Sequence, residues 1–300
     1  HYTLPGKGYV LSGSSKKVDK RVYVADKRGK LASGSGWKVT SSYTGDLQRY
    51  YFAGDYAKAG HFKVGKHHYY GTSKGYVLRG ALKVGGWTLL ANNDGKLATK
   101  KGWVITKTYA GTKQRYYLER QKAGYSAARN GLSSKGGYKH YTIAGKGYVS
   151  RNGYCAAKGG YYVSNDAGKL TSVSARQYRM VTTAYATPPT GSGLCALWVS
   201  NVSSRAGFGY KALDACDMYD EWCWWSDRSR LKPGMLVAVR SHPHTTAGSI
   251  WGHVGIYVGG STILDSVGGE VRRCDLSWWL SHYGATVAPK WGWYLGNSLA

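Results

Sequence analysis

Over residues 1–190 the hydrophobic positions fall in short aromatic and β-branched runs, which Gly-containing turns such as Arg28-Gly29 and Asn93-Asp94-Gly95 separate. Such turns need a positive φ, which Asn-Gly and Asp-Gly pairs supply at low cost. No stripe of helical period appears there, and Pro is scarce. The pattern predicts an N-terminal all-β hairpin array over residues 1–181, in which aromatic faces stack because one hairpin cannot bury a core.

The hairpin segments form a true internal repeat. Several motifs recur at one common offset of 66 positions, which chance rarely produces. These motif pairs are Gly29–Ala32 with Gly95–Ala98, Gly36-Trp37 with Gly102-Trp103, and Gln48–Tyr51 with Gln114–Tyr117. A fourth motif, Lys7–Leu11, recurs at Lys74–Leu78 and at Lys146–Val149.

The periodicity changes near Gly191. Apolar residues at 195, 198, 199, 202 and 206 have helical spacing, so we predict a helix over 194–207 that stops at Gly207. Buried strands are predicted over 236–239, 253–259 and 262–266. Residues 182–190 contain Pro188-Pro189 and are predicted to be a stiff linker between the array and a separate domain over 191–300.

Charge divides the chain in the same way. Residues 1–190 hold 33 of the 42 Lys and Arg but only 7 of the 15 Asp and Glu, whereas 9 of the 12 Trp lie after residue 190. A polycationic surface favours anionic partners: nucleic acid, anionic lipid or anionic wall polymers. No nucleic-acid-binding motif is present, and no apolar run is long enough to span a membrane. The chain begins with His1, which fits a mature secreted protein.

Three residues of the last third have the pattern of a thiol hydrolase. Cys195 lies in the first turn of the predicted helix, where the helix dipole and unpaired N–H groups favour a thiolate. His253 begins one predicted strand and Asp265 lies on the next, so the two can meet across a hairpin. Together they supply a nucleophile, a base and a group that orients the base. The competing interpretations are a buried structural Cys, a structural strand His and a salt-bridged surface Asp.

Other residues of this third are candidates for the substrate cleft or for structural roles. Two His and a Cys without tight spacing make a weak zinc signal, so we predict no metal. Cys216 and Cys223 could pair in a secreted protein, whereas Cys155 and Cys274 suggest no function. The substrate-binding candidates are Trp198, Asp217, His242, His244 and Trp251.

The motifs of the last third resemble those of NlpC/P60 and CHAP enzymes. Gly193–Ser200 resembles the Cys-Ser-Gly-Phe-Val helix start of NlpC/P60 enzymes, and its Cys-x-x-Trp-Val portion resembles CHAP domains. Lys232–Val237 resembles their Pro-Gly-Asp-Leu-Val strand, with Met235 at the usual Asp. Gly252–Gly259 is similar to their His motif almost letter for letter, and the third polar residue falls on Asp265. The resemblance implies a papain-like α+β domain over 191–300 that cleaves amide bonds of peptidoglycan through Cys195.

The repeats of residues 7–171 resemble glucan-binding and choline-binding-like cell-wall repeats in their Gly-aromatic openings, Tyr-Tyr pairs and Asn-Asp-Gly-Lys-Leu turns. They are poorer in Trp and richer in Lys than the choline-binding pattern, which argues against a Trp-built cage for a quaternary ammonium. We therefore expect Lys and Arg on the array surface to bind anionic wall polymers or glycans.

These patterns together predict a secreted or wall-associated peptidoglycan hydrolase that needs no cofactor and acts as a monomer. The repeats hold it on the cell wall, and a cysteine endopeptidase cuts stem peptides. Two alternatives stay open: an N-acetylmuramoyl-L-alanine amidase of the CHAP type, and a non-catalytic wall-binding or adhesion protein.

Overall fold

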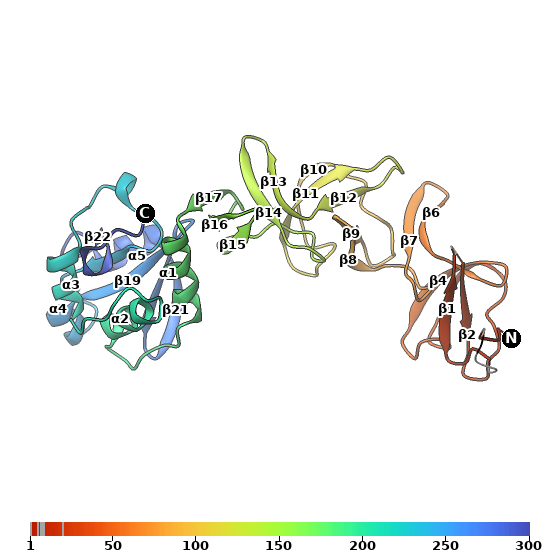
Figure 1. Cartoon of the computed structure of the whole chain (residues 1–300), viewed down its shortest axis with the longest axis horizontal. Coiled ribbons are helices and arrows are strands. Elements are labelled where there is room, and N and C mark those ends of the chain that lie inside the picture. Colours follow the sequence, from red (N-terminus) through yellow and green to blue (C-terminus); the bar gives the residue numbers. More distant parts are fainter. Residues whose placement is uncertain (1, 5, 7–9, 20) are drawn as a thin grey trace. The chain divides into compact units, whose positions relative to one another are not determined.

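The computed structural model describes the 300-residue chain except residues 1, 5, 7–9 and 20 (Figure 1). The first copy of the Lys7–Leu11 motif therefore lies partly outside the described residues. The chain divides into two compact units, one of residues 1–131 with 142–149 and one of residues 132–141 with 150–300. Most of the fold consists of β-hairpin repeats, as the sequence predicts, and helices occur in the described chain only from Ala175 onward.

The first unit contains two five-stranded sheets and one separate hairpin. The sheets have the strand orders β1-β2-β5-β4-β3 and β10-β11-β12-β9-β8, and β6 pairs with β7. The strands are β1 (Ser14–Val18), β2 (Arg21–Ala25), β3 (Ser35–Thr40), β4 (Gln48–Ala53), β5 (Ala57–Lys58), β6 (Gly60–Val64), β7 (His67–Gly71), β8 (Gly80–Val84), β9 (Trp87–Ala91), β10 (Gly102–Thr106), β11 (Gln114–Arg120) and β12 (Ser126–Arg129).

Equivalent turns follow β2 and β9, and they explain the recurring Gly-Lys-Leu motif. The Asp26 carboxylate accepts backbone N–H bonds from Arg28 and Lys30, each at 2.9 Å. The Asn92 side chain accepts the matching bonds from Asp94 and Lys96, at 3.0 and 2.9 Å. Each turn also contains a glycine at positive φ, where other residues are strained.

Small aromatic clusters, rather than one continuous core, stabilise the first unit. Tyr50 and Tyr116, which are 66 positions apart, are both fully buried. Tyr43 packs edge-on against Tyr50 with 5.4 Å between ring centroids, and Tyr109 does the same against Tyr116 at 5.5 Å. The aromatic residues therefore hold each repeat together, as expected for hairpins that cannot bury a core alone.

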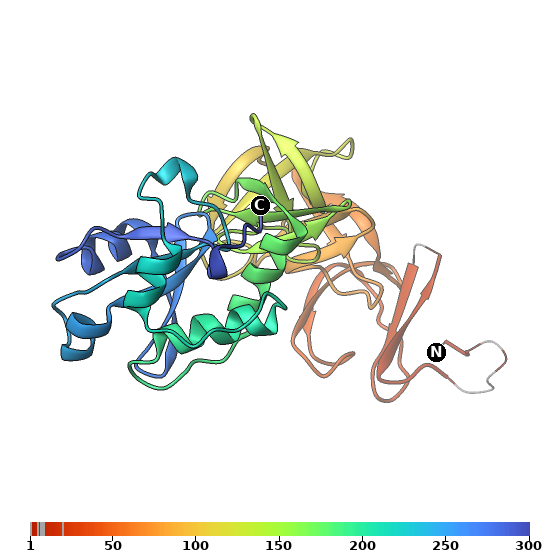
Figure 2. The same ribbon diagram turned by 60° about the vertical axis from the view of Figure 1, so that its left-hand side comes forward.

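The second unit combines the last repeat strands with five helices and an antiparallel sheet of order β21-β20-β19-β18-β22 (Figure 2). The hairpin of β13 and β14 belongs to the second unit, apart from its end residues Gly131 and Thr142. The elements are β13 (Gly131–Lys135), β14 (Tyr138–Thr142), β15 (Tyr154–Ala157), β16 (Gly160–Ser164), β17 (Leu170–Val173), α1 (Ala175–Ala186), α2 (Cys195–Arg205), α3 (Ala215–Trp222), the 3-10 turn η1 (Arg228–Arg230), β18 (Leu236–Val239), α4 (Thr246–Trp251), β19 (His253–Gly259), β20 (Thr262–Val267), β21 (Glu270–Asp275), α5 (Leu276–Tyr283), β22 (Lys290–Gly292) and η2 (Tyr294–Gly296).

The predicted domain boundary is displaced. The first residues of the expected linker, 182–186, form the end of α1, which packs on α2 and on β19. Ser174 and Gln177 make a capping box that starts this helix, and Met180, Val181 and Ala184 are buried on its inner face. Val163 of β16 also joins the core around the sheet. The last repeat strands therefore belong to the second unit instead of to the array.

The predicted elements of the last third agree with the structure at their centres. Helix α2 covers most of 194–207, and Gly207 follows it at a φ of 74°. The cysteines are all free, including Cys216 and Cys223. These two lie at opposite ends of α3, and seven helical residues span about 10 Å, beyond the reach of a disulfide. Within the described residues, no helix is both long and apolar enough to cross a membrane.

Candidate active site

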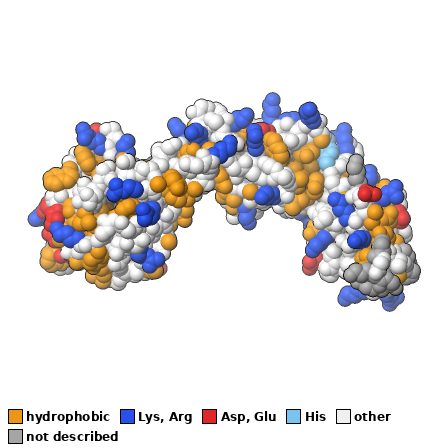
Figure 3. All heavy atoms as spheres, viewed as in Figure 1, with side chains coloured by type: hydrophobic (Ala, Val, Ile, Leu, Met, Phe, Trp, Pro, Cys, Tyr) orange, Lys and Arg blue, Asp and Glu red, His pale blue; other side chains and the backbone are white. Residues whose placement is uncertain are grey.

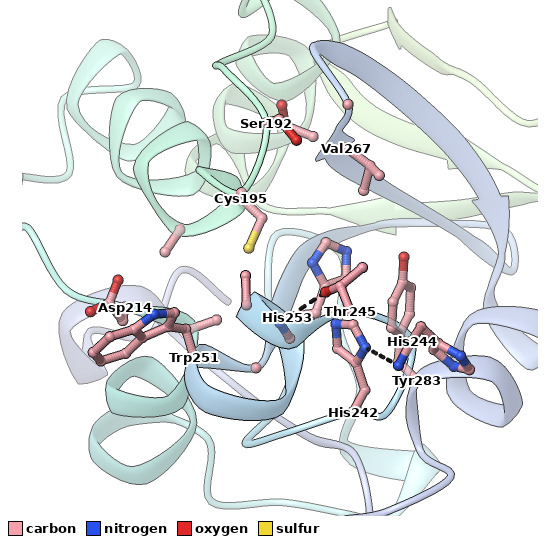
Figure 4. A pocket seen from close by; sticks show the side chains of 18 of the residues that line it. Ser192, Cys195, Asp214, His242, His244, Thr245, Trp251, His253, Val267 and Tyr283 are labelled. Atoms are coloured by element: carbon pink, nitrogen blue, oxygen red, sulfur yellow. Dashed lines mark hydrogen bonds between the residues drawn. The ribbon is translucent and has the colours of Figure 1, made fainter.

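A cavity of about 220 Å³ opens in the second unit beside the start of α2 (Figure 4). Cys195 and His253 lie in its wall, with the Cys195 sulfur directed into the opening. Asp214 and Trp251 line one side, and His242 lies deeper in the wall near His253. The cavity therefore contains two of the three predicted catalytic residues and several polar groups that could contact a substrate.

The start of α2 positions the Cys195 thiol. Gly193 turns the chain at a φ of 77°, and Cys195 becomes the first residue of the helix with 8% of its surface exposed. The residue at the cap position is Leu194, whose side chain has no acceptor. No side chain therefore caps the N–H groups of the first turn, which suits the binding of a developing oxyanion.

The Cys195 thiol is set up to ionise. Burial alone would raise the pKa of this thiol, but a hydrogen bond with His253 and backbone N–H groups of Val254 and Ala196 outweigh burial. The pKa of Cys195 therefore lies below its ordinary value. A thiolate, rather than a thiol, is the nucleophilic form of cysteine.

His253, at the start of β19, joins the thiol to the carboxylate. Its Nε2 lies 2.9 Å from Asp265 Oδ2, which leaves Nδ1 to interact with Cys195. His253 is 5% exposed, and its imidazole lies against the rings of Trp279 and Tyr283, with centroid distances of 5.7 and 4.3 Å. Burial favours the neutral ring, but the hydrogen bonds with Asp265 and Cys195 prevail and raise the pKa of His253 to about 9. A thiolate–imidazolium pair is thus favoured at neutral pH.

Asp265 is completely buried on β20 and accepts hydrogen bonds at both oxygens. Oδ2 accepts from His253 and from Trp279 Nε1 at 3.0 Å. Arg272 of β21 donates to Oδ1 from Nε at 3.1 Å and to Oδ2 from Nη2 at 2.8 Å. Burial opposes ionisation, yet His253 and Arg272 lower the pKa of Asp265 below its usual range. Asp265 therefore remains a carboxylate that orients His253.

Gly252 determines where His253 enters the cavity. It has a φ of 73°, and a Cβ there would collide with the carbonyl oxygens of Val239 and Arg240. We expect Gly252→Ala to lower the unfolding free energy by about 1–3 kcal/mol. Since the collision displaces His253, we expect the hydrolysis that the sequence predicts to fall about 100-fold in the folded variant.

Thermal melting and hydrolysis rates of the purified variant check this expectation. Gly207→Ala is the matched control, because Gly207 has a similar φ of 74° but only the end of the Arg179 side chain near its Cβ position. A Gly252→Ala protein that is as active as this control would show that the strand entry does not position His253.

A cluster of imidazoles forms the wall beside His253. The His242 ring packs on Gly248, and its Nδ1 accepts the backbone N–H of His244 at 3.3 Å. Burial and the neighbouring His253 lower the pKa of His242 to about 4, so His242 is neutral at pH 7. The His244 ring stacks on His282 with 3.8 Å between centroids. Within the described residues, no group of three or more His, Cys, Asp or Glu is arranged to hold a metal ion.

Of the five predicted substrate-binding residues, three line the cavity and two do not. His242, His244 and Trp251 line the cavity, as the substrate-binding prediction requires. Trp198 does not: it is fully buried in the core, and its Nε1 donates to the carbonyl of Thr187. Asp217 is exposed at the start of α3, where its carboxylate accepts the backbone N–H of Asp214 as part of the helix cap. The predictions for Trp198 and Asp217 are therefore corrected.

Sequence reasoning missed four residues of this site. Asp214 lines the cavity in place of Asp217. Arg272, Trp279 and Tyr283 surround Asp265 and His253. The alternation of β21 could have identified Arg272, because a short turn at Gly268-Gly269 places Arg272 opposite Asp265. The aromatic pair has no local signal of this kind.

No family model matches this chain, and no curated protein matches it. Among solved structures, CbpJ from Streptococcus pneumoniae TIGR4 is 20% identical, with a TM-score of 0.31 over 53% of this chain and 52% of that one. Choline binding protein F from Streptococcus pneumoniae is 22% identical, with a TM-score of 0.31 over 57% and 58%. The autolysin LytC from Streptococcus pneumoniae is 17% identical, with a TM-score of 0.23 over 55% and 43%. Each likeness spans about half of either chain and is weak, so nothing about the site rests on it.

Proposed function

We propose that this chain is a cell-wall-targeted cysteine hydrolase that cleaves amide bonds in the stem peptides of peptidoglycan. The observation that supports this proposal most is the buried series Cys195–His253–Asp265, in which each residue has a hydrogen-bonded partner and a pKa shifted toward its charged form. Structural cysteines are ordinarily buried in apolar surroundings that raise the thiol pKa, as at Cys223, whose pKa is raised to about 12. Cys195 shows the opposite shift beside an open cavity.

The first half of the proposed reaction forms a thioester. The Cys195 thiolate attacks the amide carbonyl carbon, and the carbonyl electrons move onto oxygen. First-turn N–H groups of α2 stabilise that oxyanion. When the intermediate collapses, the C–N bond breaks, and the His253 imidazolium gives its proton to the leaving nitrogen.

The second half restores the enzyme. Neutral His253 removes a proton from water, the hydroxide attacks the thioester carbonyl, and the C–S bond breaks to regenerate the Cys195 thiolate. The products are one amine and one carboxylic acid, which loses its proton to solvent at neutral pH, and His253 ends protonated. Asp265 keeps the imidazole oriented in both halves and stabilises its charged form.

Digestion of purified peptidoglycan by the full chain tests the proposal and separates the two enzymatic alternatives. An endopeptidase releases a new amino group on a stem residue, whereas an N-acetylmuramoyl-L-alanine amidase frees the amino group of the first stem alanine from the sugar. Mass spectrometry of the products distinguishes these ends. Binding without any new amino group would instead support the non-catalytic wall-binding protein.

We expect the rate of hydrolysis to rise and then fall with pH, because the reaction needs both the Cys195 thiolate and the His253 imidazolium. Activity rises as Cys195 loses its proton, at a pH below the usual cysteine range because the pKa of this thiol is lowered. It falls as pH rises through about 9, where His253 loses the proton that the leaving amine needs. Initial rates of amine release between pH 4 and 11 check this. A rate that keeps increasing through pH 10 would contradict the assignment of His253 as the acid.

The repeats are proposed to hold the enzyme on anionic wall polymers. Lys and Arg side chains are spread over the repeat region (Figure 3). Trp37 and Tyr51 form an aromatic corner on the β3–β4 hairpin, with 5.0 Å between centroids. Trp103 and Tyr117 form the same corner on β10–β11, at 5.1 Å. Such corners suit cations, including quaternary ammonium groups.

Arginines of the chain itself occupy both corners. Arg49 Cζ lies 3.9 Å from the Trp37 ring centre, and Arg115 Cζ lies 4.4 Å from that of Trp103. Arg49 Nη1 also donates to the Asp94 carbonyl at 2.6 Å, which holds the guanidinium in place. A ligand cation would have to displace these arginines, so we expect an anionic polymer, rather than choline, to be the partner.

The double variant Arg49→Ala/Arg115→Ala tests this expectation. We expect the full chain to bind a soluble glycerol-phosphate polymer about tenfold more weakly after the change, with a shallower dependence on salt. Lys83→Ala/Lys113→Ala removes the same charge from exposed positions and should have a smaller effect. Binding of the unmodified chain to immobilised choline, with release by free choline, would show that Arg49 and Arg115 do not exclude choline from the two corners.

The non-catalytic wall-binding protein is the second candidate. The observation that favours it is the basic repeat region, which accounts for the charge of the chain and needs no thiol to bind a polyanion. This candidate function gives the Cys195–His253 pair no role. Hydrolysis by the unmodified chain decides between the two candidates.

A further inference from the structure

The carboxylate of Asp265 has a second cationic partner besides His253. Arg272 binds both of its oxygens, with Nε on Oδ1 and Nη2 on Oδ2. The two residues face each other across the β20–β21 pair, so the backbone register itself brings them together. The two-point contact leaves the planar carboxylate no freedom to rotate, because a guanidinium and a carboxylate match each other's geometry.

Tyr283 connects this ion pair back to the imidazole. Arg272 Nη2 donates to the Tyr283 hydroxyl at 2.7 Å, and the Tyr283 ring lies against His253. Arg272 therefore contacts both the group that binds His253 Nε2 and the ring that covers the His253 face. It does not touch the cavity, since it is absent from the cavity wall.

Charges alternate through the site, from thiolate to imidazolium to carboxylate to guanidinium. Arg272 balances the charge of a fully buried carboxylate while its own side chain is 31% exposed. The titratable and charged groups around His253 are Cys195 on α2, Asp265 on β20, Arg272 on β21, His242 before α4, and His282 and Tyr283 on α5.

We propose that Arg272 is a positioning residue of the catalytic site: it fixes the Asp265 carboxylate toward His253 and offsets the carboxylate charge. This inference rests on the proposed function, since it assigns a task within the same reaction. Without Arg272, the charge of Asp265 would no longer be offset, so Asp265 would stabilise the imidazolium more strongly. The carboxylate would also lose the two-point contact that fixes its orientation toward His253.

Two substitutions separate the charge of Arg272 from its geometry. Arg272→Lys keeps the positive charge but loses the two-point contact, so we expect hydrolysis to fall about tenfold while the His253 pKa stays within a few tenths of a unit of that of the unmodified chain. Arg272→Gln removes the charge as well. We expect it to reduce hydrolysis and to raise the His253 pKa by about one unit, because the repulsion between two cations is removed.

The measurements are amine release from peptidoglycan and an NMR pH titration of ¹⁵N-labelled histidine in the full chain. The titration needs no substrate, so it tests Arg272 even if the chain proves inactive toward peptidoglycan, which would overturn the proposed function alone. Arg273→Gln is the matched control: it removes the same charge from the next residue of β21, which is paired with Leu264 instead of Asp265. It should titrate and hydrolyse like the unmodified chain.

An Arg272→Gln protein whose His253 titrates as in the unmodified chain would overturn the inference. If that variant does not fold, Arg272→Lys decides, and hydrolysis at the unmodified rate would overturn it. Thermal melting establishes that each tested variant is folded.

Discussion

Replacing Cys195 by alanine is expected to abolish amide hydrolysis, with a loss of about 10⁴-fold or more, while wall binding stays unchanged. The variant loses the sulfur atom that is proposed to form the thioester, whereas the repeats that carry the positive charge are untouched. Amine release and co-sedimentation with purified walls measure the two quantities. Cys195 lines an existing cavity, so the truncation removes one sulfur atom from its wall and should not unfold the domain.

Cys274→Ala is the matched control for this change. Cys274 lies 3.9 Å from Asp265 Oδ1, and burial raises the pKa of its thiol to about 11. It therefore remains a thiol at neutral pH and is not proposed to react. Hydrolysis should survive this substitution within a few fold, and equal losses in the two variants would show that the effect of Cys195→Ala is not specific to the nucleophile.

Asp265→Asn is expected to produce the second large effect, a loss of about 10²–10⁴-fold in hydrolysis. The amide is neutral and cannot stabilise the imidazolium as the carboxylate does. Its NH₂ group is a donor and can take the place of the oxygen that accepts the hydrogen bond from His253 Nε2. The alkaline limb of the pH profile should consequently move below pH 9, since Asp265 is one of the groups that raise the His253 pKa. An unchanged alkaline limb would show that Asp265 does not bind the catalytic imidazole.

The same substitution should also lower stability by about 2–3 kcal/mol at pH 7, because Arg272 and His253 lose their buried partner. The expected loss of stability is smaller than for a fully buried ion pair, since the Arg272 side chain is 31% exposed. The pKa of Asp265 is lowered in the folded state, so its stabilising contribution is complete above about pH 4 and disappears as pH falls through the lowered value. Urea unfolding at pH 7 and pH 3 should therefore show a difference between the two proteins that shrinks in acid.

The part of the site that local patterns encode could be predicted from the sequence. Cys195 opens an apolar stripe of helical period, and His253 and Asp265 lie on strands joined by a two-glycine turn. Trp198 shares the stripe of Cys195, which is why it lies in the core: the same spacing that identifies the helix directs this side chain inward.

The rest of the site depends on tertiary register. Arg272 is the exception, because the Gly268-Gly269 turn sets the β20–β21 register that places it opposite Asp265. Trp279 and Tyr283 reach Asp265 and His253 from a separate helix, which no local pattern predicts. Helix α1, in contrast, has a local sequence signal, because the capping box of Ser174 and Gln177 can be read from the sequence. The Pro188-Pro189 pair that follows favoured a linker interpretation, and the apolar face of Met180, Val181 and Ala184 is what places the segment in the core instead.

The most direct test of the central claim is digestion of purified peptidoglycan by the full chain in H₂¹⁸O, followed by mass spectrometry of the fragments. The proposed mechanism predicts one new amine for each new carboxylate, with one ¹⁸O atom in that carboxylate, and no such products from Cys195→Ala. The absence of new amines with the unmodified chain, or equal amounts from the Cys195→Ala protein, would contradict it.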